Sequence, residues 1–502
     1  MKLSKISLGV AAACGILSAP AHALLASAYT NAPSWPAPIS LATPGGEFVG
    51  DTMNIRVSGA TAQDPGLLAS ATRYCTAGTM TRYSISNNFV YFCTANLARV
   101  TPRAGATKIA FYKYSVGGSG AGVAPVNGGT LATPTAASLI STPFLDLAKL
   151  NTSCAPGASS VVDIDGAGPL SSFQDFTCAG ASSSLVTNAV SYIGVSDVEP
   201  QFFGGPASYS RLQAQALATV IFGVPVTKNI YEALQAAQSI PVGGITEADM
   251  PSLSQAQLTS MFTQTGQSWS GLTNATVGDD LVYVARRVDS SGTQKTFEAL
   301  VARTGNGTGG GRECQSGVEP FVAGPVALDN TAANSLCTAD NLVVNANGSG
   351  QVVACLNAHH TGGRGAIGVL TTEIKQTAGG NLRFVKINGL APTHANVAGG
   401  KYTQYADASL NTRIGATLPT ASAAGYSAFL TTLKSDFSDP AVISIINGGA
   451  QTFGASGLMA LDVLETTVPP ADYDGSEGRN PWSRLVGGSD LNNCQPGKAA
   501  AF

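Results

Sequence analysis

Charged residues are scarce in this 502-residue sequence, in which Lys, Arg, Asp and Glu together make up 11% and the net charge is −3. A protein that binds nucleic acid through its phosphates needs a basic face, and 27 basic against 30 acidic residues do not supply one. Only four histidines are present, and no group of Cys and His has the spacing of a zinc site. We therefore expect no nucleic-acid partner, no metal and no cofactor.

The sequence also lacks a membrane span, because no segment of the mature chain reaches the about 18 uninterrupted apolar residues that a span requires. The first residues are a different case. Lys2 and Lys5 precede an apolar run from Ile6 to Leu17, and Ala21-His22-Ala23 follows. This pattern predicts a secretory signal peptide, 1–23, cleaved after Ala23, and hence a periplasmic or secreted protein with a net charge of −5. A lipoprotein anchored at Cys14 is the alternative.

Cysteine is better represented, and eight of the nine remain after cleavage at Ala23. An even number in an exported chain favours disulfides. Pairing neighbours along the chain gives loops that contribute about 3 kcal/mol each in the chain-entropy model. The pairs expected in this way are Cys75–Cys93, Cys154–Cys178, Cys314–Cys337 and, as the remaining pair, Cys355–Cys494. Other pairings are open, because the sequence alone does not fix the connectivity.

Strands that end in small or hydroxyl residues recur along the chain. The strand expected at 53–58 runs into Gly59-Ala60-Thr61, and the helix after it starts at Asp64-Pro65. A second strand at 107–115 runs into the glycine-rich stretch 117–122, and a third ends at Ser196-Asp197. Repeated units of this kind predict an α/β fold, in which ligands bind beyond the carboxyl ends of the strands.

The segment from Arg287 to Thr293 has the strongest chemical pattern. It lies between an apolar strand at 280–286 and an amphipathic helix at 294–303. The free N–H groups of a helix start attract anions, and an arginine is a bidentate donor for oxyanions. Asp289 would repel an anion unless that anion carries a proton, as phosphate does and sulfate does not. The alternative is a capped helix beside a surface arginine.

Five short motifs occur in the order that is characteristic of one family. They are Gly59-Ala60-Thr61, Gly118-Ser119-Gly120, Val195-Ser196-Asp197, Arg287-Val-Asp-Ser-Ser-Gly-Thr293 and Gly365-Ala-Ile-Gly368. Over about residues 53–370, the sequence resembles the phosphate-binding proteins of bacterial phosphate ABC importers, a branch of the type II periplasmic binding proteins. The resemblance implies a two-lobed α/β fold that closes on inorganic phosphate, here with disulfide-stapled insertions. An ABC permease in the inner membrane is the implied partner, and we expect a monomer with no enzymatic activity.

The resemblance also assigns roles to residues at matching positions. Thr61 and Ser119 would donate hydroxyls from the first lobe, and Asp197 would accept a proton from the ligand. Asp289 would tune Arg287. The residues that grip the anion from the second lobe would be Arg287, Ser291, Gly292 and Thr293. The sequence departs from the family pattern at Asp64, an extra carboxylate at a helix start, at Ser290, which replaces a glycine, and in the long gap between Ser119 and Asp197.

The resemblance further implies a division of the chain. After the signal peptide, residues 24–52 would be an extended lead-in. The first lobe would comprise 53–205, with an insertion at about 123–185, and would be completed by about 405–466. The second lobe would comprise 206–404, with an insertion at about 304–350, and 467–502 would be a C-terminal extension.

Two other functions remain open at this point. A secreted phosphoesterase could use the same scaffold if a nucleophile or metal lay beside the anion. An extracellular matrix or adhesion protein could retain the fold without the ligand. The mature histidines favour neither metal nor triad chemistry, because His359-His360 is predicted to lie in a solvated loop and His394 in a surface turn.

Overall fold

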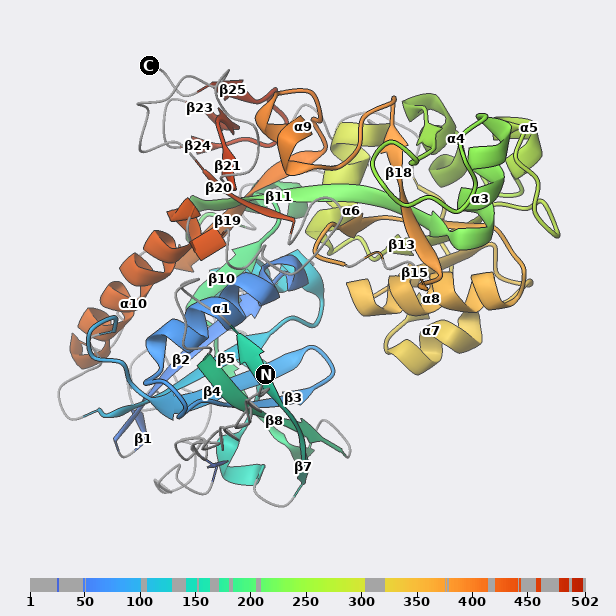
Figure 1. Ribbon diagram of the computed structural model, residues 1–502. Helices are drawn as coiled ribbons and strands as arrows, with labels where there is room; N and C mark the ends of the chain where they lie inside the picture. The colour runs from blue at the N-terminus through green and yellow to red at the C-terminus, as the bar shows by residue number, and fades with distance from the viewer. Residues whose placement is uncertain are drawn as a thin grey trace, which may run out of the picture.

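The chain forms two lobes, each built around β-strands, in a computed structural model (Figure 1). The expected signal peptide, most of the lead-in 24–52 and Cys314 lie outside the residues that the structure describes. The described residues are 25–26, 48–49, 51–100, 106–128, 141–150, 153–162, 171–179, 184–204, 209–302, 321–374, 376, 379–413, 420–440, 442–443, 457–461, 478–486 and 490–499.

The first lobe is a mixed sheet whose central strands are parallel. β2 lies between β5 and β10 and runs parallel to both, so that the carboxyl ends of all three reach the same edge. The strands, in spatial order, are β7 (Cys154–Val162), β8 (Ser171–Cys178), β3 (Thr81–Ile85), β4 (Asn88–Thr94), β5 (Lys108–Tyr114), β2 (Thr52–Gly59), β10 (Ile193–Ser196) and β19 (Tyr405–Arg413). β7 and β8 come from the stretch expected to be an insertion, and they extend this sheet.

One long strand connects the lobes. The first part of β11 (Leu212–Thr227) pairs with β19 in the first lobe, and residues Val224 to Thr227 pair with β18 (Leu382–Ile387) in the second. Residues 217–227 are all buried, because both faces of this half of the strand are covered. The two lobes therefore share a continuous hydrogen-bonded element, visible as the long green strand in Figure 1.

The second lobe has its own parallel strands. β13 (Tyr283–Arg287) lies between β16 (Ala366–Gly368) and β15 (Val343–Ala346), parallel to both. Short strands complete this side of the structure, namely β12 (Ser252–Leu253) beside β18, β14 (Val326–Ala327) beside β15, and β17 (Leu370–Thr371) beside β11. β15 is thus part of the sheet, although it comes from the second half of the stretch expected to be an insertion.

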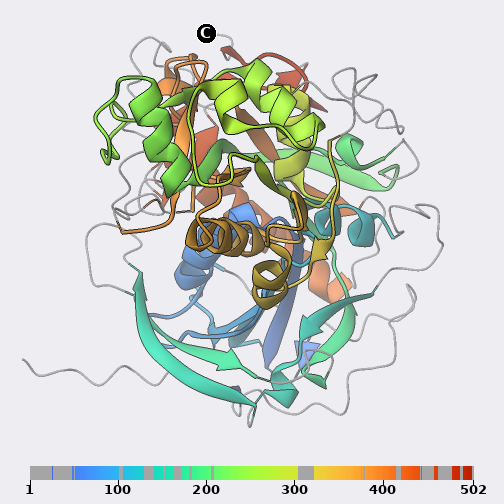
Figure 2. The same cartoon turned by 90° about the vertical axis from the view of Figure 1, so that its right-hand side faces the viewer.

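Helices cover the sheets of both lobes. Figure 2 shows the green and yellow-green helices of the second lobe at one end and the curved teal strands between residues 141 and 196 at the other. No helix in the described part of the chain is long and apolar enough to span a membrane. The helices are α1 (Asp64–Tyr74), α2 (Ala124–Asn127), α3 (Lys228–Ala237), α4 (Gln255–Thr263), α5 (Trp269–Thr273), α6 (Gly292–Phe297), α7 (Asn330–Leu336), α8 (Ser349–Thr361), α9 (His394–Ala398) and α10 (Thr420–Ser438).

The remaining elements are short. The 3-10 helices used below are η2 (Thr61–Gln63) and η3 (Gly118–Gly122), and α6 continues into a π-helix, η8 (Glu298–Ala302). Near the C-terminus, β20 (Leu458–Leu461) pairs with β11 and with β21 (Arg479–Asn480). Separate two-stranded pairs are β6 (Ser141–Leu145) with β9 (Val186–Val190), β22 (Trp482–Ser483) with β25 (Lys498–Ala499), and β23 (Leu485–Val486) with β24 (Asp490–Leu491). β1 (Phe48–Val49) pairs with the start of β2.

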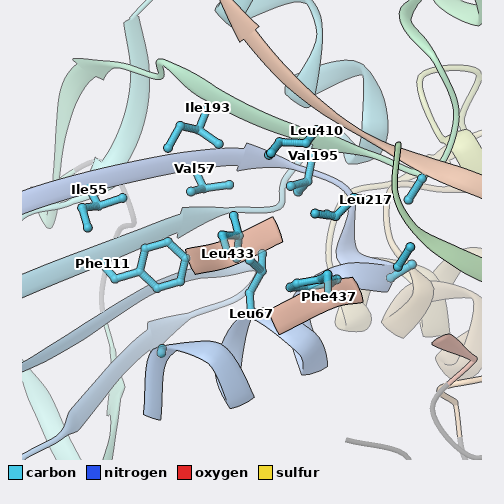
Figure 3. Packing of buried hydrophobic residues seen from close by; sticks show 14 of the residues in the cluster. Ile55, Val57, Leu67, Phe111, Ile193, Val195, Leu217, Leu410, Leu433 and Phe437 are labelled. Atoms are coloured by element: carbon cyan, nitrogen blue, oxygen red, sulfur yellow. The ribbon is translucent and has the colours of Figure 1, made fainter. Parts of the chain in front are cut away.

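Each lobe has a separate apolar core. In the first lobe, Val57 of β2 and Val195 of β10 lie on the sheet face that Leu67 of α1 and Phe437 of α10 cover (Figure 3). In the second, Val284 and Trp269 belong to a different cluster of buried side chains. This two-lobed α/β arrangement, with disulfides in both lobes, confirms the fold class expected from the sequence.

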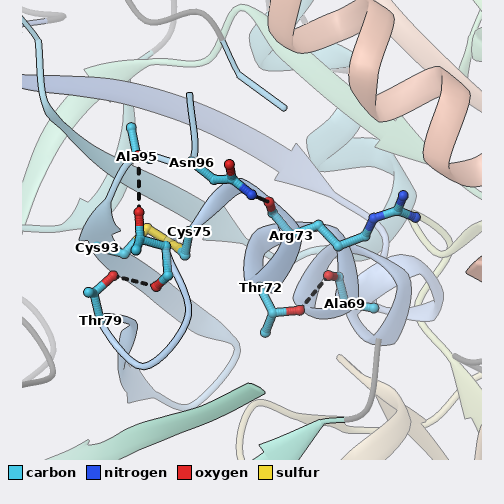
Figure 4. The surroundings of a disulfide bond; sticks show 9 residues. Ala69, Thr72, Arg73, Cys75, Thr79, Cys93, Ala95 and Asn96 are labelled. Carbon is cyan, nitrogen blue, oxygen red and sulfur yellow. Dashed lines mark hydrogen bonds between the residues drawn. A yellow bond between two sulfur atoms is a disulfide. The ribbon is translucent and has the colours of Figure 1, made fainter. Parts of the chain in front are cut away.

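Two of the four expected disulfides are confirmed. Cys75 joins Cys93 where α1 ends beside β4, close to the hydrogen bond from Asn96 to the Arg73 carbonyl (Figure 4). Cys154 joins Cys178 across the paired strands β7 and β8.

The other two expected pairings, Cys314–Cys337 and Cys355–Cys494, are wrong. Cys337, which caps the end of α7, is bonded to Cys355, which is buried on α8. α7 and α8 pack together, which brings Cys355 on the next helix within bonding distance of Cys337. Cys494 also forms a disulfide.

Peptide mapping without reduction should recover Cys337 linked to Cys355. Replacing both with serine should lower the free energy of unfolding by about 3 kcal/mol, because the cross-link restricts the unfolded chain. Denaturant unfolding measures this loss. A peptide in which Cys337 is linked to Cys314 would contradict the connectivity.

Candidate functional site at the junction of the lobes

The turn after β2 brings Thr61 to the second lobe. Gly59 has φ +123°, and a Cβ at this position would lie 1.9 Å from the Val195 carbonyl oxygen, so only glycine fits. The next residue, Ala60, donates its N–H to that same carbonyl at 2.9 Å. The chain then enters η2, and the Thr61 hydroxyl lies 3.4 Å from the Ser349 hydroxyl of α8. Thr61 thus contacts the opposite lobe from a helix start.

Asp197 follows β10 and is 2% exposed. Its N–H donates to the Ser119 hydroxyl at 3.0 Å, which connects the second and third motifs of the first lobe. One carboxylate oxygen accepts from the Gln63 amide at 3.0 Å, and the other accepts from the Thr293 hydroxyl of the second lobe at 3.1 Å. A carboxylate has about four lone-pair positions, so these two hydrogen bonds leave Asp197 able to accept further hydrogen bonds.

Arg287 is the last residue of β13 and is 1% exposed. Its guanidinium donates to the Ser349 hydroxyl and to the carbonyl of Asn347, both at 3.2 Å, and to the carbonyl of Ala346 at 3.3 Å. These acceptors form the turn from β15 into α8. The turn therefore holds the guanidinium beside the start of α8, on the side that faces Thr61.

The turn from Ser290 to Thr293 contacts the first lobe directly. The Gly120 N–H of η3 donates to the Ser290 carbonyl at 2.8 Å. Ser291 caps α6 by accepting from the Gln294 N–H at 3.4 Å. A Cβ on Gly292 would lie 2.3 Å from the Ser119 hydroxyl oxygen. The missing side chain of Gly292 is thus what allows the two lobes to approach.

Burial shapes the charges at this junction. It raises the pKa of Asp197, while the hydrogen bond from Gln63 and the charge of Arg287 oppose the rise. It lowers the pKa of Arg287 to about 10, and the carboxylates of Asp197 and Glu373 oppose that change. Burial also holds the pKa of Glu373 well above its usual range. The junction thus combines one guanidinium, two acidic groups and several hydroxyls, and Arg287 and Asp197 are the charged members that are almost out of contact with water.

Seven of the eight residues expected from the sequence lie at this junction, namely Thr61, Ser119, Asp197, Arg287, Ser291, Gly292 and Thr293. Asp289 does not share their contacts. Its side chain is 69% exposed and pairs with Arg286 rather than with Arg287. Arg286 and Arg287 point to opposite faces of β13. Asp289 lies in the turn after the strand has ended, where its carboxylate reaches Arg286. The acidic groups that act on Arg287 are instead Asp197 and Glu373.

Three further residues lie at the junction without having been expected from the sequence: Gln63, Ser349 and Glu373. Ser349 follows β15 in another strand-to-helix turn of the kind discussed above, but it lies in a Gly/Asn-rich stretch that was interpreted as an insertion. Glu373 lies just beyond β17, past the end of the Gly365–Gly368 motif. Gln63 is distinguishable only by its position in η2, where its amide reaches Asp197.

The prediction that His359-His360 lies in a solvated loop is wrong. Both residues are in the last turn of α8, and His359 is 1% exposed because Val352, Leu356 and His359 share the buried face of the helix. Among the described residues, His359 forms the one group of three potential metal ligands with Cys337 and Cys355. The two cysteines are joined in a disulfide, so the thiolates that would bind a metal are not available.

Comparisons with known proteins return distant structural similarities. No protein-family model and no curated protein matches the sequence. One similar solved structure, from Clostridium perfringens, is described as a candidate phosphate ABC transporter substrate-binding protein with bound phosphate; it is 14% identical, with 75% of this chain and 93% of that chain covered and a TM-score of 0.37. Others are an ABC-type phosphate transport receptor from Vibrio cholerae (18% identity, 51% and 79% covered, TM-score 0.30) and PstS from Borrelia burgdorferi (12% identity, 75% and 92% covered, TM-score 0.30).

These scores assign neither family nor function.

The contact between Gly292 and Ser119 predicts how a single methyl group would act. Gly292→Ala places a Cβ against Ser119 and against the Cβ of Asp197, at 2.7 Å, so the lobes have to separate or shift. We expect overpacking to cost about 1–3 kcal/mol and to lower the midpoint of thermal unfolding. Gly379→Ala is the matched control, because a Cβ there meets nothing within 4 Å. Equal midpoints for both variants would contradict the close approach.

Proposed function

We propose that the chain is an exported solute-binding protein that binds inorganic phosphate, or a similar protonated tetrahedral oxyanion, between its two lobes. The observation that carries the proposal is the junction itself. Arg287 of one lobe and Asp197 of the other are both almost fully buried there, with the hydroxyls of Thr61, Ser119 and Thr293 beside them.

The groups at the junction have the properties that phosphate requires. The guanidinium of Arg287 offers paired N–H donors that match two oxygens of a tetrahedral anion. Hydroxyls can donate to the remaining oxygens without adding charge. Asp197 retains acceptor positions after its bonds to Gln63 and Thr293, so it can accept a proton from the ligand. Phosphate carries such a proton near neutral pH and sulfate does not, which gives a physical basis for selectivity.

The arrangement of the lobes supports binding by closure. β11 connects the lobes. The direct contacts at the junction are hydrogen bonds between loop ends and the packing of the segment from Gly292 to Leu300 against the first lobe. Lobes that rotate about a shared strand can open to admit a ligand and close around it. Closure would exclude water and strengthen each hydrogen bond to the anion. An exported protein of this kind would serve uptake or scavenging, as a monomer in the periplasm or outside the cell, with an ABC permease as its partner for uptake.

Calorimetry on refolded, ligand-stripped protein tests the ligand. We expect phosphate and arsenate to bind, sulfate not to bind, and Arg287→Ala to weaken phosphate binding at least tenfold, because a charged hydrogen bond contributes about 1.5–3 kcal/mol. Binding of none of the three anions would contradict the proposal and favour the matrix or adhesion alternative. Steady release of nitrophenol from a nitrophenyl phosphate, lost in Arg287→Ala, would favour the phosphoesterase.

Asp197→Asn tests the basis of selectivity. The amide adds N–H donors and removes the carboxylate charge, so sulfate should bind better relative to phosphate, and the ratio of the two dissociation constants should fall. Asp289→Asn is the matched control and should leave the ratio within about twofold, since Asp289 is exposed and pairs with Arg286. A ratio that changes in the control and not in Asp197→Asn would contradict this role.

A further inference from the structure

A second pair of charged residues, Lys113 and Asp64, lies beside the turn that carries Thr61, and no pattern in the sequence predicts this pair. Lys113 belongs to β5, beside Val57 of β2, and its side chain is fully buried. Its ammonium lies 3.1 Å from the carboxylate of Asp64, the first residue of α1. Ser115 accepts from the ammonium and donates to the same carboxylate at 2.9 Å. Lys113 therefore neutralises Asp64, the extra carboxylate at the helix start.

The ammonium of Lys113 also holds the backbone of the turn. It donates to the carbonyls of Gly59 at 2.9 Å and of Ala60 at 3.1 Å. In a trans peptide group the N–H points away from the C=O. The peptide group between Gly59 and Ala60 illustrates this geometry. Its carbonyl accepts from Lys113, and its N–H donates in another direction, to the Val195 carbonyl. In the same way, the bond to the Ala60 carbonyl directs the Thr61 N–H away from Lys113.

The pair also affects the charge that an anion would meet. Burial raises the pKa of Asp64, the charge of Lys113 opposes the rise, and the nearby charge of Asp197 adds to it. Burial lowers the pKa of Lys113, and the carboxylates of Asp64 and Asp197 oppose this change. Without the ammonium, the first lobe would present the buried carboxylate of Asp197 and the partly exposed carboxylate of Asp64 with no compensating charge beside them.

We propose that Lys113 is a positioning residue for the anion site, which orients the Thr61 turn and neutralises Asp64 so that Asp197 alone accepts the ligand's proton. This inference rests on the proposed function. With Lys113 and Asp64 paired, and Arg287 balanced by Asp197, these four charges sum to zero, and burial favours the neutral form of Glu373 by raising its pKa. Such a site favours a monoanion that can donate a proton over a dianion.

The test uses variants that keep the buried charges balanced. Lys113→Met alone leaves Asp64 without its ammonium, so the double variant Asp64→Asn, Lys113→Met is made, and circular dichroism and thermal unfolding confirm that it folds. We expect phosphate affinity to fall at least tenfold, because the carbonyls of Gly59 and Ala60 lose their donor. The control removes another ion pair of the same sheet, Arg82→Met with Asp175→Asn, whose charged atoms are 2.6 Å apart. It should bind phosphate as the wild type does.

Asp64→Asn alone keeps Lys113 and adds one positive charge to the site. Sulfate should then bind at least fivefold better relative to phosphate. A double variant that binds phosphate like the wild type, or an Asp64→Asn variant with an unchanged sulfate-to-phosphate ratio, would overturn the inference while the wild type still binds phosphate. A wild type that fails to bind phosphate would overturn the proposed function and this inference together.

Discussion

The structure depends on keeping a small set of charged groups away from water at the place where the two lobes meet. A buried charge is tolerated only if it is paired and hydrogen-bonded. Arg287, Asp197 and Lys113 are each at most 2% exposed, and each has several polar partners. The hydrogen bonds of Lys113 lie within the first lobe and those of Arg287 within the second. Asp197 differs, because its carboxylate also accepts from Thr293 of the opposite lobe, and this bond forms only where the two lobes meet.

The long strand β11 makes that arrangement possible. Its two halves pair with different sheets, which places the carboxyl ends of β2 and β10 opposite the end of β13. β11 is one continuous strand, whereas the junction is made of separate hydrogen bonds between loop ends and of side-chain packing from α6 and η8. β11 thus fixes the lobes at one side, and the contacts at the junction hold them less firmly at the other. A ligand that forms further hydrogen bonds at the junction can therefore favour one relative orientation of the lobes.

The structure explains three positions at which the sequence departs from the pattern of the phosphate-binding proteins that it resembles. Asp64 would be unfavourable beside an anion, but Lys113 and Ser115 compensate it within hydrogen-bond distance. Ser290 uses its carbonyl rather than its side chain to contact Gly120. Part of the long gap between Ser119 and Asp197 contains β7 and β8, which extend the first sheet and carry their own disulfide. None of these changes disturbs the set of groups at the junction.

The sequence by itself determined the local elements and most of the junction. The order of strand ends bearing glycine and hydroxyl residues is a local property, because a strand-to-helix turn needs glycine where backbones approach and polar caps where N–H groups are free. This is why Thr61, Ser119, Asp197 and the Arg287–Thr293 turn could be found. Tertiary structure alone decided which side chains meet. It paired Cys337 with Cys355, directed Asp289 to Arg286, and brought Ser349, Glu373 and Lys113 to the junction. Such contacts join elements far apart in the chain, and local sequence patterns carry no information about the distance between them.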